Sequence, residues 1–221
     1  MKMAETRDLC KSYKVENREI LILDQISLSV DAGEFLVIAG SSGSGKSTLL
    51  TLMSGLDRPD SGKVLIQGRD ISHLKEDELA PLRNAVFGFV FQSFHLVPSL
   101  TALENVMFPA ELRRDPDAAE KAGVLLERAG MGKRKGSFPH QLSGGEKQRV
   151  AICRALINEP KIIFADEPTG NLDSAHSRAV LSILCQLREE KDAALVLVTH
   201  SKEIADMADR VVFLKDGRLD I

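Results

Sequence analysis

A glycine-rich loop between an apolar run and a helix-forming run constrains the fold of this chain more than any other feature. The loop occupies residues 40–47 and reads Gly-Ser-Ser-Gly-Ser-Gly-Lys-Ser. Residues 35–39 before it are all apolar, as in a buried strand, and residues 47–53 after it suit a helix that Gly55 can end. The sequence therefore predicts a strand, a tight loop and a helix in succession.

The loop matches the pattern G-x-x-x-x-G-K-[ST], the P-loop or Walker A motif. Glycines let backbone N–H groups close around an anion, and the positive end of the helix dipole adds to the attraction. Lys46 would reach the β- and γ-phosphates of a nucleoside triphosphate, and the Ser47 hydroxyl would bind Mg²⁺. We expect the phosphates to contact Gly40, Ser41, Ser42, Gly43, Ser44, Gly45, Lys46, Ser47 and Thr48. A turn that binds nothing is disfavoured, because both flanking elements and the final Lys-Ser are present.

The composition limits the partners of the chain. It has 221 residues, 43% of them hydrophobic, which suits one domain or one domain with an inserted subdomain. The net charge of −3 gives no electrostatic reason to expect nucleic acid as a partner. Three widely separated cysteines make disulfides and zinc improbable. We expect no signal peptide and no membrane span, so a membrane role would need a separate partner.

Further apolar and alternating runs predict an α/β fold with a parallel sheet. Strands are expected at residues 26–30, 63–67, 86–91, 162–165, 194–198 and 211–214, and helices at residues 76–83, 118–129 and 175–190. The first two strands suggest an antiparallel β element beside the nucleotide. From Thr101 to about Asn158 the pattern is helical and is punctuated by prolines, including Pro109 and Pro139, so this stretch is predicted to be an inserted helical subdomain.

Polar side chains follow several predicted strands. Asp166 and Glu167 end one strand, where open α/β sheets bind ligands, and Asp166 is expected to hold Mg²⁺ while Glu167 activates water. His200 follows another strand and would hydrogen-bond the γ-phosphate or the water if its strand neighbours that of Asp166. Gln92 follows a third and would bind Mg²⁺ or orient water. An acidic turn, an incidental histidine and a surface glutamine are the structural alternatives.

The string Leu-Ser-Gly-Gly-Glu at residues 142–146 has two interpretations. Ser143 is placed as an N-cap with Glu146 as its capping-box partner, which is a complete structural explanation. A serine and two glycines at a helix N-terminus also form an anion site, as in the P-loop.

Together these motifs resemble those of the ATP-binding cassette (ABC) ATPases, from about Arg7 to Arg218. The resemblance identifies the Walker A loop, a glutamine loop at Gln92, the signature at residues 142–146, Walker B at Asp166 and Glu167, an aspartate loop at residues 171–173 and a switch histidine, His200. Tyr13 stands where the family has its adenine-stacking aromatic residue.

The resemblance implies a single ABC ATPase domain over residues 1–221, a P-loop NTPase with a mixed central sheet, an antiparallel β subdomain and an inserted helical subdomain. Its nucleotide-binding core would comprise about residues 1–92 and 159–221, and its helical subdomain about residues 93–158. The cofactors implied are ATP and Mg²⁺. Lys46, Gln92, Glu167 and His200 would be catalytic, and Ser47, Gln92 and Asp166 would hold the metal.

Members of the family pack as head-to-tail homodimers with ATP between the Walker A loop of one subunit and the signature of the other. Ser143, Gly144, Gly145 and Glu146 would therefore contact nucleotide across the dimer, and Asp173 would contact the opposing subunit. Gln92 and residues 93–103 would meet an integral-membrane permease. The protein would lie in the cytoplasm, peripheral on the inner face of the cell membrane.

Residues 88–106 and 165–173 are similar to one branch of the family, which includes the LolD, MacB, YbbA and FtsE cassettes. The resemblance implies an ATPase that powers a separate permease of the FtsX/MacB-like kind, for lipoprotein release or substrate export. An FtsE-like regulator of a cell-wall enzyme and a soluble ABC ATPase are the alternatives. The sequence does not encode the transported substrate, because the permease selects it.

Overall fold

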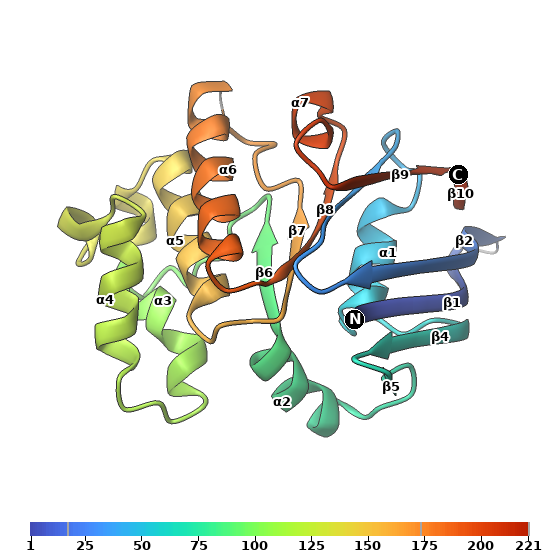
Figure 1. The fold of residues 1–221 in the computed structure, drawn as a ribbon, viewed down its shortest axis with the longest axis horizontal. Coiled ribbons are helices and arrows are strands. Elements are labelled where there is room, and N and C mark those ends of the chain that lie inside the picture. The colour runs from blue at the N-terminus through green and yellow to red at the C-terminus, as the bar shows by residue number, and fades with distance from the viewer. Residues whose placement is uncertain (17, 173, 221) are drawn as a thin grey trace. The chain divides into compact units, whose positions relative to one another are not determined.

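The computed structural model describes residues 1–16, 18–172 and 174–220, which form two compact units. The first unit comprises Met1–Arg83 and Ala194–Ile221, and the second comprises Asn84–Ala193. Figure 1 labels the helices and strands of both units. In the described ranges, no helix has the length and apolar character that crossing a lipid bilayer requires.

The strand that leads into the glycine loop lies between two parallel strands in the first unit. Strand β3 (Phe35–Ala39) pairs in parallel with β8 (Ala194–Thr199) on one side and β9 (Arg210–Lys215) on the other, and β10 (Arg218–Asp220) pairs antiparallel with β9, so the sheet is mixed. Every residue of β3 and β8 is buried, as their continuous apolar sequences predict. Helix α1 (Lys46–Met53) follows β3, and the short helix α7 (Lys202–Ala205) follows β8.

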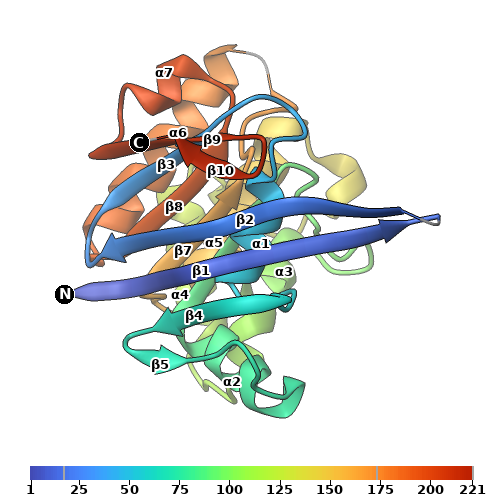
Figure 2. The same ribbon diagram turned by 90° about the vertical axis from the view of Figure 1, so that its right-hand side faces the viewer.

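The first unit also contains the predicted antiparallel element, which is larger than expected. Strands β1 (Lys2–Val15), β2 (Arg18–Asp31), β4 (Ser61–Ile66) and β5 (Arg69–Asp70) form one sheet in the order β2-β1-β4-β5. Figure 2 shows β1 and β2 side by side as a long hairpin. The sequence did not indicate β1, because register shifts along its pairing with β2 interrupt the alternation of apolar residues. Helix α2 (Glu76–Val86) contains the boundary between the units.

The second unit combines two parallel strands with a group of helices. Strand β6 (Phe87–Phe91) pairs with β7 (Ile162–Asp166). Its helices are α3 (Ala102–Glu111), α4 (Ala118–Arg128), α5 (Gly144–Leu156) and α6 (Ser174–Glu189), with 3₁₀ turns η1 (Gly132–Arg134) and η2 (Pro139–Gln141) before α5. A Cβ on Gly88 would lie 2.4 Å from the carbonyl oxygen of Ala155, so this glycine allows α5 to pack directly on β6.

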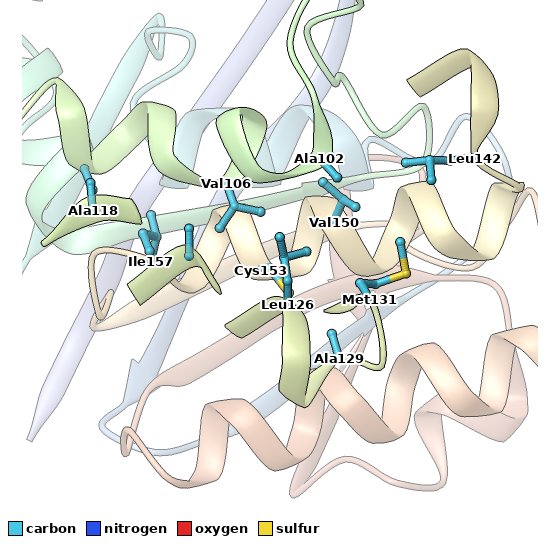
Figure 3. Packing of buried hydrophobic residues seen from close by; sticks show 12 residues of the cluster. Ala102, Val106, Ala118, Leu126, Ala129, Met131, Leu142, Val150, Cys153 and Ile157 are labelled. Carbon is cyan, nitrogen blue, oxygen red and sulfur yellow. The ribbon is translucent and has the colours of Figure 1, made fainter. Parts of the chain in front are cut away.

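The predicted helical region has its own apolar core. Figure 3 shows Val106, Leu126, Val150 and Cys153 pointing into the space between their helices. The full cluster comprises Ala102, Val106, Ala110, Ala118, Ala122, Leu126, Ala129, Met131, Leu142, Val150, Cys153 and Ile157. Proline usually interrupts a helix, but Pro109 does not, because α3 continues past it to Glu111.

Leu126 provides a test of this helical core. It is completely buried on α4, so Leu126→Ala leaves a cavity, and we expect the free energy of unfolding to fall by about 3 kcal/mol. Val124 on the same helix is 53% exposed, and Val124→Ala should change stability by less than about 0.5 kcal/mol. Urea denaturation followed by circular dichroism measures both, and equal losses would contradict the packing described.

Candidate nucleotide-binding and catalytic site

Close backbone contacts hold the P-loop in the first unit and require glycine at two positions. A Cβ on Gly40 would lie 2.3 Å from the carbonyl oxygen of Leu214, which belongs to β9. Gly45 has a φ of 101°, and a Cβ there would lie 2.9 Å from the carbonyl oxygen of Ile22 on β2. Both contacts exclude a side chain, so the spacing of the glycines follows from the neighbouring strands as well as from a ligand.

The polar groups of the loop are arranged to receive an anion. Helix α1 has no side-chain cap on its first N–H groups and no acidic residue in its first turn. The ammonium of Lys46 folds back onto the loop, where it donates to the carbonyl oxygens of Gly40 at 3.0 Å and Ser41 at 2.8 Å. Among the described residues, the buried hydroxyl of Ser44 has no hydrogen-bond partner. Phosphate oxygens would satisfy the helix N-terminus and this hydroxyl together.

The switch histidine lies at the same end of the sheet as the P-loop. The register of β3 and β8 pairs Ala39 with Thr199, so Gly40 and His200 are the next residues on adjacent parallel strands. The Thr199 hydroxyl accepts a hydrogen bond from the N–H of Ser201 at 3.0 Å, which shapes the turn after β8. The His200 side chain is exposed beyond this turn.

Tyr13 also belongs to the first unit. Its side chain is 40% exposed, and its hydroxyl donates to the carboxylate of Asp57 at 2.7 Å. Partial burial, followed by the hydrogen bond to Asp57, raises the pKa of Tyr13 to about 12. The predicted adenine-binding ring is therefore half accessible and fixed at its hydroxyl.

The second unit brings the glutamine loop and the Walker B carboxylates together. The register of β6 and β7 pairs Phe91 with Asp166, so Gln92 and Glu167 are the next residues on adjacent parallel strands. Glu167 has a φ of 43°, in the left-handed region that non-glycine residues rarely adopt, and its carbonyl oxygen accepts from the N–H of Gly170 at 3.0 Å. Strain at a carboxylate that ends a strand is typical of functional sites.

Gln92 is joined to the segment after Walker B by a reciprocal pair of hydrogen bonds. Its side-chain amide donates to Oδ1 of Asn171 at 3.2 Å, and the Asn171 amide donates to the carbonyl oxygen of Gln92 at 3.0 Å. A Cβ on Gly170 would lie 2.8 Å from the Gln92 amide nitrogen. These two hydrogen bonds join the glutamine loop to the start of the aspartate loop in this unit. The predicted residue Asp173 lies outside the described residues.

The signature has the capping geometry that its sequence allows. The Ser143 hydroxyl accepts from the N–H of Glu146 at 3.3 Å, and the Glu146 carboxylate accepts from the N–H of Ser143 at 2.8 Å. The N–H of Ser143, with help from its hydroxyl and from Arg134, lowers the pKa of Glu146. The Ser143 hydroxyl is therefore engaged with Glu146 through its oxygen, which accepts from the N–H of Glu146. Gly144 packs closely against Leu172, to which an added Cβ would approach within 3.2 Å.

Arg154 is a structural residue of this unit that the sequence reasoning missed. From α5 its guanidinium donates to the carbonyl oxygen of Phe94 at 2.8 Å and to that of His95. Phe94 and His95 have φ values of 61° and 47°, so the segment after Gln92 is strained and is held by this arginine. Burial lowers the pKa of Arg154. Its position one helical turn after the buried Val150, on the inner side of α5, was the available signal.

The ABC transporter family matches residues 23–170 of the chain. The chain therefore belongs to the ABC transporter family. The uncharacterized ABC transporter ATP-binding protein MJ1508 of Methanocaldococcus jannaschii is 48% identical over 98% of this chain and 97% of its own length. The lipoprotein-releasing system ATP-binding protein LolD of Syntrophotalea carbinolica is 45% identical over 98% of this chain and 96% of its own length.

Longer proteins are equally similar. The macrolide export ATP-binding/permease protein MacB of Syntrophobacter fumaroxidans is 46% identical over 100% of this chain, which spans only 31% of the MacB sequence. Among solved structures, the cassette MJ0796, described as a dimer in a post-hydrolysis state bound to ADP and Pi, is 40% identical with a TM-score of 0.92, covering 99% of this chain and 97% of its own. These similarities confirm the predicted cassette fold and the likeness to the LolD and MacB branch.

Replacing Arg154 tests its structural role. Arg154→Met removes two charge-assisted hydrogen bonds and leaves the carbonyl groups of Phe94 and His95 without their donor, so we expect a loss of about 3 kcal/mol in the free energy of unfolding. Arg154→Lys keeps the charge but not the planar pair of donors, and should lose roughly half as much. Urea denaturation measures both variants. A methionine variant as stable as the wild type would rule out this role.

Proposed function

We propose that the chain is the ATP-binding and ATP-hydrolysing subunit that powers a separate integral-membrane permease of the LolD and MacB type. The observation that carries the catalytic part is that Gln92 and Glu167 directly follow the paired residues Phe91 and Asp166. In the same chain, the helix after the P-loop has no side-chain cap, and the buried Ser44 hydroxyl has no partner among the described residues. The relative LolD, named as the ATP-binding protein of a lipoprotein-releasing system, supports this role.

In this proposal the P-loop and Lys46 hold the phosphates of ATP. Lys46 would exchange its two loop carbonyl acceptors for phosphate oxygens, which offer full negative charge. Glu167 acts as the general base that takes a proton from the attacking water, and His200 hydrogen-bonds the γ-phosphate. Catalysis of this kind depends on positioning and charge stabilisation.

The metal proposed is Mg²⁺, with ligands from Ser47, Asp166 and Gln92. Hydroxyl, carboxylate and amide oxygens are ligands that Mg²⁺ accepts, and it commonly uses few protein ligands together with phosphate oxygens. When bound, Mg²⁺ neutralises charge that develops on the phosphate oxygens.

The partner proposed for the signature is the nucleotide of a second copy of the chain. The hydroxyl of Ser143 and the N–H groups at the start of α5, at Gly144 and Gly145, would donate to the γ-phosphate. Glu146 caps the helix beside them, and Asp173 is proposed to contact the opposing copy. The dimeric structures described for MJ0796 support this arrangement.

The helical subdomain, the location and the kind of permease are proposed from the likeness to the LolD and MacB branch. We propose that residues 93–158 act as the helical subdomain, that the cassette lies in the cytoplasm on the inner face of the membrane, and that its permease is of the FtsX/MacB-like kind. An FtsE-like regulator that controls a cell-wall enzyme through its permease is the second candidate, because it would use the same site.

Glu167→Gln tests the catalytic assignment. The substitution keeps the shape of the side chain but removes the base, so we expect ATP binding within about twofold of the wild type and a turnover lower by at least about 10²-fold. Isothermal titration and phosphate release measure the two quantities. Glu120→Gln, an exposed change on α4, is the matched control and should hydrolyse ATP normally. Normal turnover by Glu167→Gln would exclude Glu167 as the base.

Capture from membranes tests the partner. A tagged Glu167→Gln protein, held in the ATP-bound state, is expected to co-purify from detergent-solubilised membranes with an integral-membrane protein that has a large extracytoplasmic domain. Mass spectrometry identifies the partner, and cells that carry the untagged protein provide the background. Recovery of only soluble proteins or nucleic acid would contradict the permease proposal while leaving the ATPase assignment intact.

A further inference from the structure

Tyr13 is held from two directions by charged residues that no part of the catalytic scheme uses. It lies on β1 opposite Ile20 of β2, and both side chains are partly exposed. Its hydroxyl donates to Asp57, and the ammonium of Lys11 lies 5.1 Å from the centroid of its ring. An exposed aromatic side chain usually samples several rotamers, but these contacts fix this ring.

Lys11 is unusual because it is only 8% exposed. A buried lysine needs partners, and its ammonium donates to the carbonyl oxygen of Arg58 at 2.6 Å and contacts the Asp57 carboxylate at 3.1 Å. With these partners, the ammonium of Lys11 lies against one face of the Tyr13 ring. A cation near one face of a tyrosine ring is attracted by the ring electrons, so that face is occupied.

Asp57 connects this pair to the helix that begins at the P-loop. Asp57 and Leu56 lie just beyond the C-terminal end of α1. The N–H of Asp57 donates to the carbonyl oxygen of Thr51, in the last turn of the helix, at 3.3 Å, and the N–H of Leu56 donates to the same oxygen at 2.9 Å. Although burial acts in the opposite direction, hydrogen bonds from Tyr13, from the N–H of Arg58 and from Lys11 lower the pKa of Asp57. The carboxylate is therefore charged, and it ties the tyrosine to α1.

We propose that Lys11 and Asp57 are positioning residues that set the ring of Tyr13 relative to the P-loop, so that its outer face receives the purine base of the nucleotide. This inference rests on the proposed nucleotide site. The phosphates would bind at the N-terminus of α1, and Asp57 lies just beyond the C-terminus of the same helix. One helix therefore fixes the spacing between the phosphate and base subsites. Lys11 and Asp57 contribute to affinity for the base without touching the nucleotide.

The chain offers a direct probe of this arrangement. Tyr13 is its only tyrosine, and it has no tryptophan, so phenolate absorbance and intrinsic fluorescence report on Tyr13 alone. In Asp57→Asn the acceptor loses its charge, and we expect the pKa of Tyr13 to fall from about 12 toward the ordinary value of about 10. A spectrophotometric pH titration of the folded protein measures this change.

The functional test compares ATP with inorganic triphosphate, which has no base. Asp57→Asn should weaken ATP binding about tenfold, as expected when base stacking is lost, and leave triphosphate binding within about twofold. In the Tyr13→Ala background, Asp57→Asn should have no further effect on ATP affinity, because the residue acts through the ring. Asp77→Asn, an exposed change on α2, is the control and should match the wild type.

Three results would overturn the inference. Unchanged ATP affinity in Asp57→Asn, with a lowered pKa of Tyr13, would show that the network only stabilises the fold. Equal weakening of ATP and triphosphate would place the effect at the P-loop. Failure of the wild type to bind either ligand would remove the proposed function itself. If Asp57→Asn does not fold, Tyr13→Phe keeps the ring and removes its anchor, and it should show the same selective loss of ATP affinity.

Discussion

Hydrogen-bonded register between parallel strands is the constraint on which the candidate site depends. In the first unit it places Gly40 and His200 directly after paired residues of β3 and β8, and in the second it places Gln92 and Glu167 directly after paired residues of β6 and β7. A slip of one residue would turn each side chain to the opposite face of its sheet. Strands β3 and β8 are fully buried, and β6 and β7 are mostly buried, so the packing of the apolar residues also fixes the polar strand ends.

The candidate site residues combine several departures from the usual rules of a folded chain. The first turn of α1 has no cap, Ser44 has a buried hydroxyl with no partner in the described part of the chain, and Glu167 has a strained backbone. By contrast, α3 and α5 begin with complete capping boxes. Such departures destabilise a fold unless a ligand satisfies them, and the two at the P-loop are what a phosphate site requires.

Arginine and lysine side chains away from the phosphates have organising roles in both units. Arg154 holds the strained segment after Gln92 through two backbone carbonyl groups, and Lys11 with Asp57 holds Tyr13. Arg154 donates to two backbone carbonyl oxygens, and Lys11 contacts a carbonyl oxygen and a carboxylate, so each partly or largely buried cation has hydrogen-bond acceptors. The segment after Gln92 and the ring of Tyr13 are thus anchored at defined residues.

The sequence by itself determined the class of fold and the chemistry. The glycine loop, the signature and the strand-end carboxylates identify an ABC cassette, because these functions require particular residues at fixed spacing. The long strand β1 could not be predicted, because bulges disrupt its alternation, and Pro109 gave a false signal of a break since α3 continues through it. Only the tertiary structure decided that Arg154 binds Phe94 and His95 and that Asp57 binds Tyr13, because these contacts join residues far apart in the chain and depend on how the elements pack.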